Sequence, residues 1–320
     1  MTTPFPLLRL PLLPLMQVCR CMDTVEVFAF SLLSKRTNTT AKRLKITRSI
    51  DVNVHENHVQ LCFRDVQDIL IYLDLENDQA RADVKLQNRW SSWNNLPIST
   101  SELLNRTLNV FNCGFIHKLE FVDIPRYNVL PILATLPNIK EVTSYLDITN
   151  EINSRALKAL LPKTSRVTLY PEAEYNNPEK LQETLIENLD YIEIIAFGRD
   201  FRLNLDDVLI TNATEFYFYG VSLREQDLNR LLKLWITGKF NTRMEHLRFA
   251  LQEGFNRDNI LNGLNAIELP RTTTRTFEFP TSQTISSKTI YGGHDIRRGD
   301  GDLVTVDIHG LHYYNIYFWP

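Results

Sequence analysis

The sequence predicts a mixed fold of the α+β and α/β classes. A short helical segment and a small antiparallel β region precede a longer region in which strands and helices alternate. Two observations support this prediction. Apolar residues alternate with a period of two from residue 46 to about 86, and again from 266 to the end, which is typical of half-buried strands. Between these regions, strand-like segments begin 22 to 30 residues apart, with helix-like segments between them.

Composition restricts the class of protein. The chain has 320 residues, a net charge of −3, 43% hydrophobic residues and 23% charged residues, as in soluble globular proteins. This charge does not attract nucleic acid or an anionic membrane, and no apolar run approaches the ~18 residues of a membrane span. The four cysteines lack zinc-site spacing, and a secretory signal is not recognisable. We therefore expect free thiols, a cytoplasmic and/or nuclear location, and neither nucleic acid nor membrane as a partner.

Residues 4–48 form the predicted helical segment. Leucines and prolines alternate at its start, and Asp23 with Glu26 makes a capping-box pattern that separates two short helices. The second helix has apolar residues on nearly every side before Lys35, so it must be covered from more than one direction. Because so short a segment cannot cover itself, we expect one face to pack on the rest of the chain and another on a separate protein.

The order of residues in this segment resembles an F-box, most closely the nematode type that opens with a Phe-Pro-Leu-Leu run. The resemblance implies docking on the Skp-type adaptor of a cullin–RING ubiquitin ligase. The residues that it places at or near this interface are Leu10, Pro11, Leu15, Val18, Met22 and Val27. Thr37 stands where many F-boxes have tryptophan, and Pro14 replaces a usual polar residue. These departures leave open a degenerate F-box that does not bind the adaptor.

Residues 49–90 are predicted to form a β-rich connecting segment, an antiparallel meander. The expected strands are 50–54, 59–63, 69–75 and 82–86. His55 and His58 stand in one turn, where a missing third ligand favours a surface turn over a metal site. The basic residues just before, 35–48, lack interleaved aromatic residues, which favours a solvated helix face and linker over a nucleic-acid patch.

Residues 91–265 are predicted to form a repeat-like α/β region. The expected strands begin at Lys118, Lys140, Arg166, Tyr191, Glu215 and Glu245, and the helix-like segments are 129–136, 152–161, 179–188, 205–210 and 224–235. One strand and one helix every ~20–29 residues is the leucine-rich-repeat period, so we expect an irregular solenoid. The alternative is an ordinary α/β sheet. Few glycines and the lack of a phosphate-binding glycine loop favour the solenoid.

Alternation along these strands predicts which side chains turn outwards. Leu119 and Phe121 point inwards, so their neighbours Lys118 and Glu120 point outwards, and the same rule exposes Thr168. A surface rich in tyrosine and arginine results, and these types are enriched at binding hot spots. The alternative is that some tyrosines are half-buried sheet residues. The predicted target-binding residues are Lys118, Glu120, Arg166, Tyr170, Tyr191, Tyr217, Tyr219, His246 and Arg248.

Residues 205–250 resemble the F-box-associated type 2 domain. The resemblance rests on Thr211-Asn212, Asp227–Asn229, Leu232–Trp235, Gly238 and Met244–Leu247. Within this segment Leu228, Leu231, Leu232 and Trp235 have helical core spacing, and Gly238 is the expected helix stop. Residues 266–320 return to a period of two and are predicted to form a C-terminal β cap, with Asp300-Gly301 in a hairpin turn.

These patterns contain no motif for catalysis. A nucleophile motif, a phosphate-binding loop and a metal-binding helix are not recognisable, so we expect no enzyme activity, no cofactor and no metal. The two resemblances together imply the substrate-recognition subunit of a Skp–cullin–F-box E3 ubiquitin ligase, with an unknown target protein held by the repeat surface. The alternative is a non-catalytic repeat scaffold whose degenerate F-box does not bind the adaptor.

Overall fold

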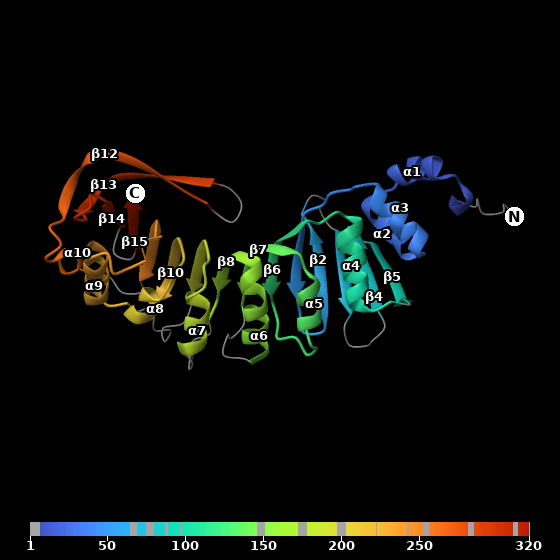
Figure 1. The fold of residues 1–320 in the computed structure, drawn as a ribbon, viewed down its shortest axis with the longest axis horizontal. Coiled ribbons are helices and arrows are strands. Elements are labelled where there is room, and N and C mark those ends of the chain that lie inside the picture. Colours follow the sequence, from blue (N-terminus) through green and yellow to red (C-terminus); the bar gives the residue numbers. More distant parts are fainter. Residues whose placement is uncertain are drawn as a thin grey trace. The chain divides into compact units, whose positions relative to one another are not determined.

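The computed structural model describes residues 7–64, 69–74, 80–86, 89–96, 98–145, 151–171, 178–196, 203–221, 223–241, 243–251, 256–280, 285–309 and 313–319. They divide into two compact units, Met1–Lys140 and Glu141–Pro320. Each unit contains both helices and sheet strands (Figure 1).

Three short helices open the first unit: α1 (Leu12–Arg20), α2 (Thr24–Leu32) and α3 (Lys35–Arg43), after a 3-10 turn, η1 (Leu7–Arg9). Asp23 and Glu26 form the predicted capping box, in which the Glu26 backbone N–H donates to Asp23 Oδ1 at 2.8 Å. The third helix was not predicted as a separate element. A second capping box, between Ser34 and Thr37, begins it inside the segment expected to be a helix face and linker.

An antiparallel meander follows the helices, as predicted. Its strands are β1 (Ile50–Val54), β2 (His58–Phe63), β3 (Ile69–Asp74), β4 (Ala80–Leu86) and β5 (Arg89–Leu96), and each pairs antiparallel with the next. The fifth strand was not predicted, because its Trp-Ser-Ser-Trp sequence lacks a clear apolar alternation. The ring of Trp93 on β5 meets the ring of Phe28 on α2 edge-on at 5.8 Å, which fixes the helices to this sheet.

The first unit continues with α4 (Thr100–Val110), β6 (Phe115–Phe121) and α5 (Leu130–Thr135). Strand β6 pairs parallel to β1, so the strand order in this unit is β6-β1-β2-β3-β4-β5. Helix α4 buries Leu103, Leu104 and Leu108. The sheet therefore changes from antiparallel to parallel pairing at β1.

The second unit alternates strands and helices at the predicted positions. Its strands are β7 (Asn138–Ser144), β8 (Thr164–Leu169), β9 (Tyr191–Ile195), β10 (Glu215–Val221) and β11 (His246–Leu251). Its helices are α6 (Glu151–Leu160), the 3-10 turn η2 (Leu161–Lys163), α7 (Pro178–Leu185), α8 (Leu205–Leu209), α9 (Glu225–Ile236) and α10 (Arg257–Leu261). Strands β8 to β11 are parallel to one another. The alternation is thus confirmed, and its assignment to leucine-rich repeats stays a prediction.

Helix α9 shows why this part of the sequence folds as expected. Leu228, Leu231, Leu232 and Trp235 are all buried, as their spacing predicted. The helix ends in a Schellman motif, in which the Gly238 N–H donates to the Trp235 carbonyl and the Lys239 N–H to the Leu234 carbonyl, each at 2.9 Å. Gly238 takes a φ of 67°, which glycine adopts without strain.

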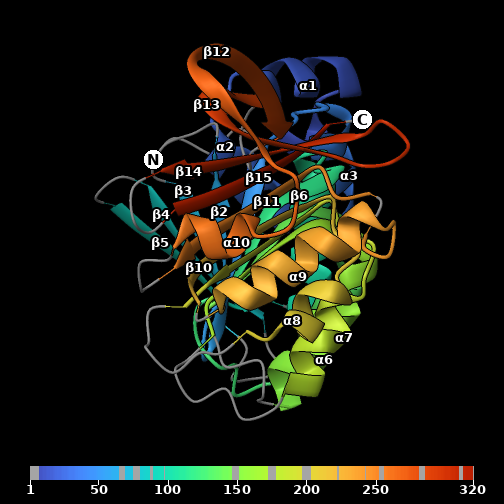
Figure 2. The same cartoon turned by 90° about the vertical axis from the view of Figure 1, so that its left-hand side faces the viewer.

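The C-terminal strands complete the second unit. They are β12 (Ile267–Pro280), β13 (Ile285–Arg297), β14 (Leu303–His309) and β15 (Tyr313–Trp319), and β15 pairs antiparallel with β11. The strand order of this unit is β12-β13-β14-β15-β11-β10-β9-β8-β7. The predicted turn between β13 and β14 is present, since the Arg298 N–H donates to the Asp302 carbonyl at 2.8 Å. Helices α7–α9 lie on one side of strands β9–β11, and the β12–β13 hairpin lies on the other (Figure 2).

Candidate functional site

The N-terminal helices expose several large apolar side chains. Leu13 on α1 is 77% exposed, and Leu33, directly after α2, is 69% exposed. Leu8, Leu12 and Val18 are exposed to between 37% and 40%. Single exposed apolar residues are ordinary, but five of them on η1, on α1 and directly after α2 are typical of a surface that another protein covers.

The six residues predicted to contact an adaptor fall into three groups. Pro11 and Val18 are exposed, and Leu10 and Met22 are half-buried. Leu15 and Val27, however, are fully buried within the chain. These two side chains have no surface left for direct contact with an adaptor, because they form the inward sides of α1 and α2, and their place near the interface stays a prediction. Leu13, which the prediction omitted, is the most exposed apolar side chain of α1.

Two of the predicted target-binding residues lie in the first unit. Lys118 and Glu120, on β6, form an ion pair with each other and are half-buried. The other seven lie in the second unit. Among them Tyr170 follows β8, and its ring stacks on the ring of Tyr145 with centroids 4.5 Å apart.

In the second unit, the register of the sheet gathers five of the seven predicted residues into two rows on one face. Register partners in adjacent strands point the same way. The first row is Arg166, Tyr191, Glu215, His246 and Tyr317. The second row is Thr168, Glu193, Tyr217, Arg248 and Asn315. We call these two rows the polar face. The alternate positions, such as Ile192, Phe216 and Leu247, are buried, so the predicted phase of the strands is confirmed.

The expected exposure of part of this face was wrong. Arg166 and Thr168 are each only 5% exposed, and His246 is 7% exposed. The Arg166 guanidinium lies over the ring of Tyr191 at 4.2 Å. The ring of His246 stacks on Tyr317 at 4.8 Å and is also covered by Phe277 of β12, at 5.6 Å. Tyr219, at 37%, is exposed on β10, while Tyr217 is half-buried beside Arg248.

Burial shifts the protonation of two groups on the polar face. The pKa of Glu215 is raised to about 7, chiefly by burial and against the opposing charge of Arg166. The pKa of His246 is lowered to about 3, chiefly by burial and then by the charges of Lys288 and Arg248. Both shifts favour the neutral form of the side chain. The face is therefore a largely internal network of polar and aromatic groups, open to solvent at the half-buried positions and at Tyr219.

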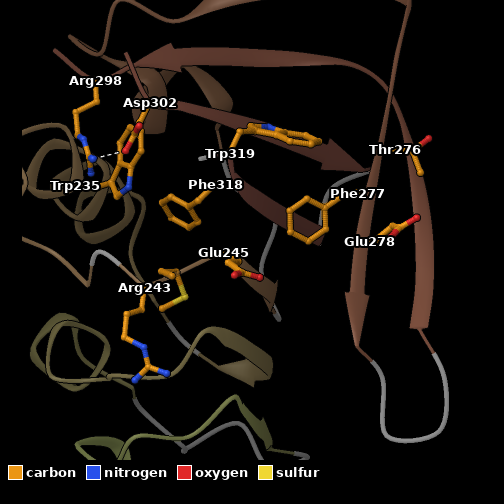
Figure 3. Close-up of a pocket in the computed structure, with 11 residues that line it drawn as sticks. Trp235, Arg243, Glu245, Thr276, Phe277, Glu278, Arg298, Asp302, Phe318 and Trp319 are labelled. Carbon is orange, nitrogen blue, oxygen red and sulfur yellow. Dashed lines mark hydrogen bonds and ion pairs between the residues drawn. The ribbon is translucent and has the colours of Figure 1, made fainter. Parts of the chain in front are cut away.

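A pocket of about 600 Å³ lies at one end of this unit. Four aromatic side chains line it: Trp235 of α9, Phe277 of β12, and Phe318 and Trp319 of β15 (Figure 3). Trp235 and Phe318 pack with ring centroids 5.5 Å apart, and Phe277 meets Trp319 edge-on at 5.4 Å. The sequence did not indicate this pocket. Trp235 was recognised as a core residue, but the elements that join it here come from separate parts of the chain.

The described residues contain no cluster of metal ligands. Among them, no three histidine, cysteine, aspartate or glutamate side chains gather in a way that would hold a metal ion. His55 and His58 stack on each other at 4.5 Å, and His55 Nδ1 lies 3.2 Å from Asp123 Oδ2. Within the same residues, no helix has the length and apolar character needed to span a membrane.

Comparison with known proteins identifies two segments of the chain. Residues 7–49 match the F-box domain family, and residues 180–249 match the F-box associated family FBA_2. The F-box associated domain-containing protein sdz-33 of Caenorhabditis elegans is 24% identical over 252 residues, which cover 74% of this chain and 76% of that protein. No solved structure matches the chain significantly. Both sequence resemblances are confirmed: an F-box stands at the N-terminal helices, and the F-box associated segment begins at 180, earlier than residue 205.

Proposed function

We propose that this chain is the substrate-recognition subunit of a Skp–cullin–F-box E3 ubiquitin ligase. The F-box match at residues 7–49 suggests a substrate-adaptor role in such a ligase. The N-terminal helices, residues 4–48, dock on the Skp-type adaptor. The repeat-like region 91–265, with the connecting segment 49–90 before it and the β cap 266–320 after it, holds a target protein. The chain performs no catalysis and acts in the cytoplasm or the nucleus.

The observation that carries the proposal is the exposed apolar surface of the F-box helices. Leu13 and Val18 lie in solvent, although their neighbours Leu15 and Cys19 on the same helix are fully buried. Helix α1 therefore already has a complete internal face, and its exposed leucines are available to a second protein. Protein interfaces commonly owe most of their affinity to a few well-packed residues near the centre.

The polar face of the second unit supports the target-binding part of the proposal. Its half-buried tyrosines and arginines, such as Tyr217 with Arg248, are of the types enriched at interfaces. A target held there raises the local concentration of its lysines near the conjugating enzyme, to about the millimolar range for a well-matched span. Tethering by this chain is then sufficient to speed the transfer of ubiquitin to the target, without any catalytic group on the chain itself.

Co-expression with a Skp-type adaptor, followed by size-exclusion chromatography, tests the proposal. We expect a one-to-one complex with the wild-type chain, and its loss when Leu10 and Pro11 are both replaced by aspartate. Circular dichroism should show the double variant folded, because Pro11 is exposed and Leu10 is half-buried. A folded wild-type chain that does not bind the adaptor would instead support the alternative function, a non-catalytic repeat scaffold with a degenerate F-box.

A further inference from the structure

The pocket of the second unit has walls that are fixed in place before any ligand binds. Trp235, Phe318 and Phe277 are only 3%, 4% and 7% exposed, so the chain itself packs most of their surface. The indole N–H of Trp319 donates to Thr305 Oγ1 at 2.9 Å. Rigid aromatic walls reduce the entropic cost of binding.

Two of the carboxylates that line this pocket, Glu245 and Glu278, form no ion pair with a described residue. Glu245 is held on both sides by its backbone: its N–H donates to the Thr214 carbonyl, and its carbonyl accepts from the Phe318 N–H, each at 2.8 Å. Its side chain is exposed and lies beneath Phe318 and Phe277 (Figure 3). Among the described residues, no lysine, arginine or histidine forms an ion pair with it.

The two arginines that line the pocket do not neutralise this carboxylate. Arg298 is engaged by Asp300 and Asp302. Arg243 donates from Nη1 to Asn188 Oδ1 at 3.1 Å, and its guanidinium points away from the aromatic rings (Figure 3). With three carboxylates and two arginines in its lining, this aromatic-lined pocket is available to a cation from outside the chain.

The walls of the same pocket show which cation suits them. The guanidinium of Arg298 lies over the ring of Trp235 at 5.2 Å and is bound by carboxylates. The guanidinium of Arg275 lies over the ring of Trp319 at 5.8 Å and is bound by both oxygens of Asp295, at 2.6 and 2.7 Å. Twice, then, an indole and a carboxylate together hold an arginine of the chain. Glu245 beside Phe277 and Phe318 offers a related combination, a carboxylate next to phenyl rings instead of an indole (Figure 3).

We propose that this pocket binds an arginine side chain of the target protein, with its guanidinium against the aromatic rings and paired with Glu245. A planar guanidinium both stacks on aromatic faces and pairs with a carboxylate through two N–H groups, which an ammonium group does not do. This inference rests on the proposed role as a target receptor and gives it a substrate class: proteins that present an accessible arginine.

The test titrates the full-length chain with the peptide acetyl-Gly-Gly-Arg-Gly-Gly-amide, followed by tryptophan fluorescence and calorimetry. Trp235 and Trp319 report directly on the pocket. A matched peptide with citrulline in place of arginine has the same shape without the charge. We expect a roughly millimolar dissociation constant for the arginine peptide and binding at least about tenfold weaker for the citrulline peptide.

Glu245→Gln should lower the affinity for the arginine peptide by about tenfold or more, and Glu245→Asp should retain much of the wild-type affinity. Glu268→Gln, which removes an exposed carboxylate outside the pocket, is the matched control and should change nothing. Equal affinity for the two peptides, an unchanged Glu245→Gln variant, or no binding of the arginine peptide would overturn the inference. Adaptor binding, measured on the same samples, is independent of this pocket. If the chain binds the peptide but not the adaptor, the proposed ligase role fails while the arginine pocket stands.

Discussion

In the N-terminal helices large apolar side chains lie in solvent, whereas in the sheet of the second unit charged side chains are buried. Leu13 is 77% exposed, while Glu215 is 2% exposed and Arg166 is 5% exposed. Apolar side chains are usually buried and charged ones usually exposed, so the two regions depart from this rule in opposite directions. An exposed leucine gains free energy when a partner covers it, but a buried glutamate has already lost its water and must find its compensation inside the chain.

The difference separates two kinds of evidence for an interaction surface. On the F-box helices, exposure itself identifies the residues available to an adaptor. On the polar face, partial exposure is found at Tyr191, Tyr217 and Arg248, and buried residues such as Arg166 and Glu215 pack beside them. Replacing an exposed residue is therefore expected to change binding, whereas replacing a buried residue beside it is expected to change the stability of the chain.

Substitutions along α1 should show the largest contrast. Leu15→Ala removes a fully buried side chain and should lower the free energy of unfolding by about 2–5 kcal/mol. Leu13→Ala, two residues earlier, removes an exposed side chain and should change it by no more than about 0.5 kcal/mol. Urea unfolding of the two full-length variants measures both. Similar losses for the two would mean that α1 does not have the internal and external sides described.

His246 should make stability fall in acid. Its pKa is lowered to about 3 in the folded chain from the ordinary 6.5, so the unfolded chain takes up a proton that the folded chain refuses. The stability that the neutral ring contributes is present above pH 6.5 and is lost as the pH falls towards 3. Between pH 7 and pH 5 this one group should cost about 2 kcal/mol.

His246→Phe is the variant that isolates this effect. It keeps a ring against Tyr317 and Phe277 and cannot be protonated. Chemical denaturation at pH 7 and pH 5 should therefore show a smaller loss of stability in the variant than in the wild-type chain. Equal losses in both proteins would show that His246 is open to solvent, and that the β12–β13 hairpin does not cover it.

The two tyrosines of β10 should show the smallest contrast. Tyr217 is half-buried, with the Arg248 guanidinium 4.6 Å from its ring, so Tyr217→Ala should cost about 1–2 kcal/mol. Tyr219 is exposed, and Tyr219→Ala should cost less than about 1 kcal/mol. Thermal melting of the two variants compares them. A larger loss of stability for Tyr219→Ala than for Tyr217→Ala would mean that Tyr219, and not Tyr217, is the buried residue of the two.

Local patterns in the sequence were enough to predict most of the strands, although not β5. Alternation placed Ile192, Phe216 and Leu247 on the inner side of the parallel strands, and all three are buried. The capping box at Asp23 and the glycine stop at Gly238 were also recognisable, because each is made by residues within one helical turn. Such short-range chemistry depends little on the rest of the fold.

Burial of the polar face could not be predicted in the same way. One residue that covers His246 is Phe277. It lies on β12, about thirty residues further along the chain, and β12 pairs with β13 and not with the strand of His246. The pocket likewise joins α9, β12 and β15 with the segment before β11. Alternation tells which side of a strand a residue occupies, but only the tertiary structure tells what lies over that side.

Calorimetric titration of a Skp-type adaptor into the full-length chain tests the central claim most directly. The claim predicts one-to-one binding that Leu13→Asp weakens by about a hundredfold or abolishes, since a charge then replaces an apolar anchor. Ile186→Asp, which charges a 55% exposed apolar residue of the second unit, is the matched control and should leave binding unchanged. No binding by the wild-type chain, or equal binding by the Leu13→Asp variant, would contradict the assignment of the exposed F-box helices as the adaptor surface.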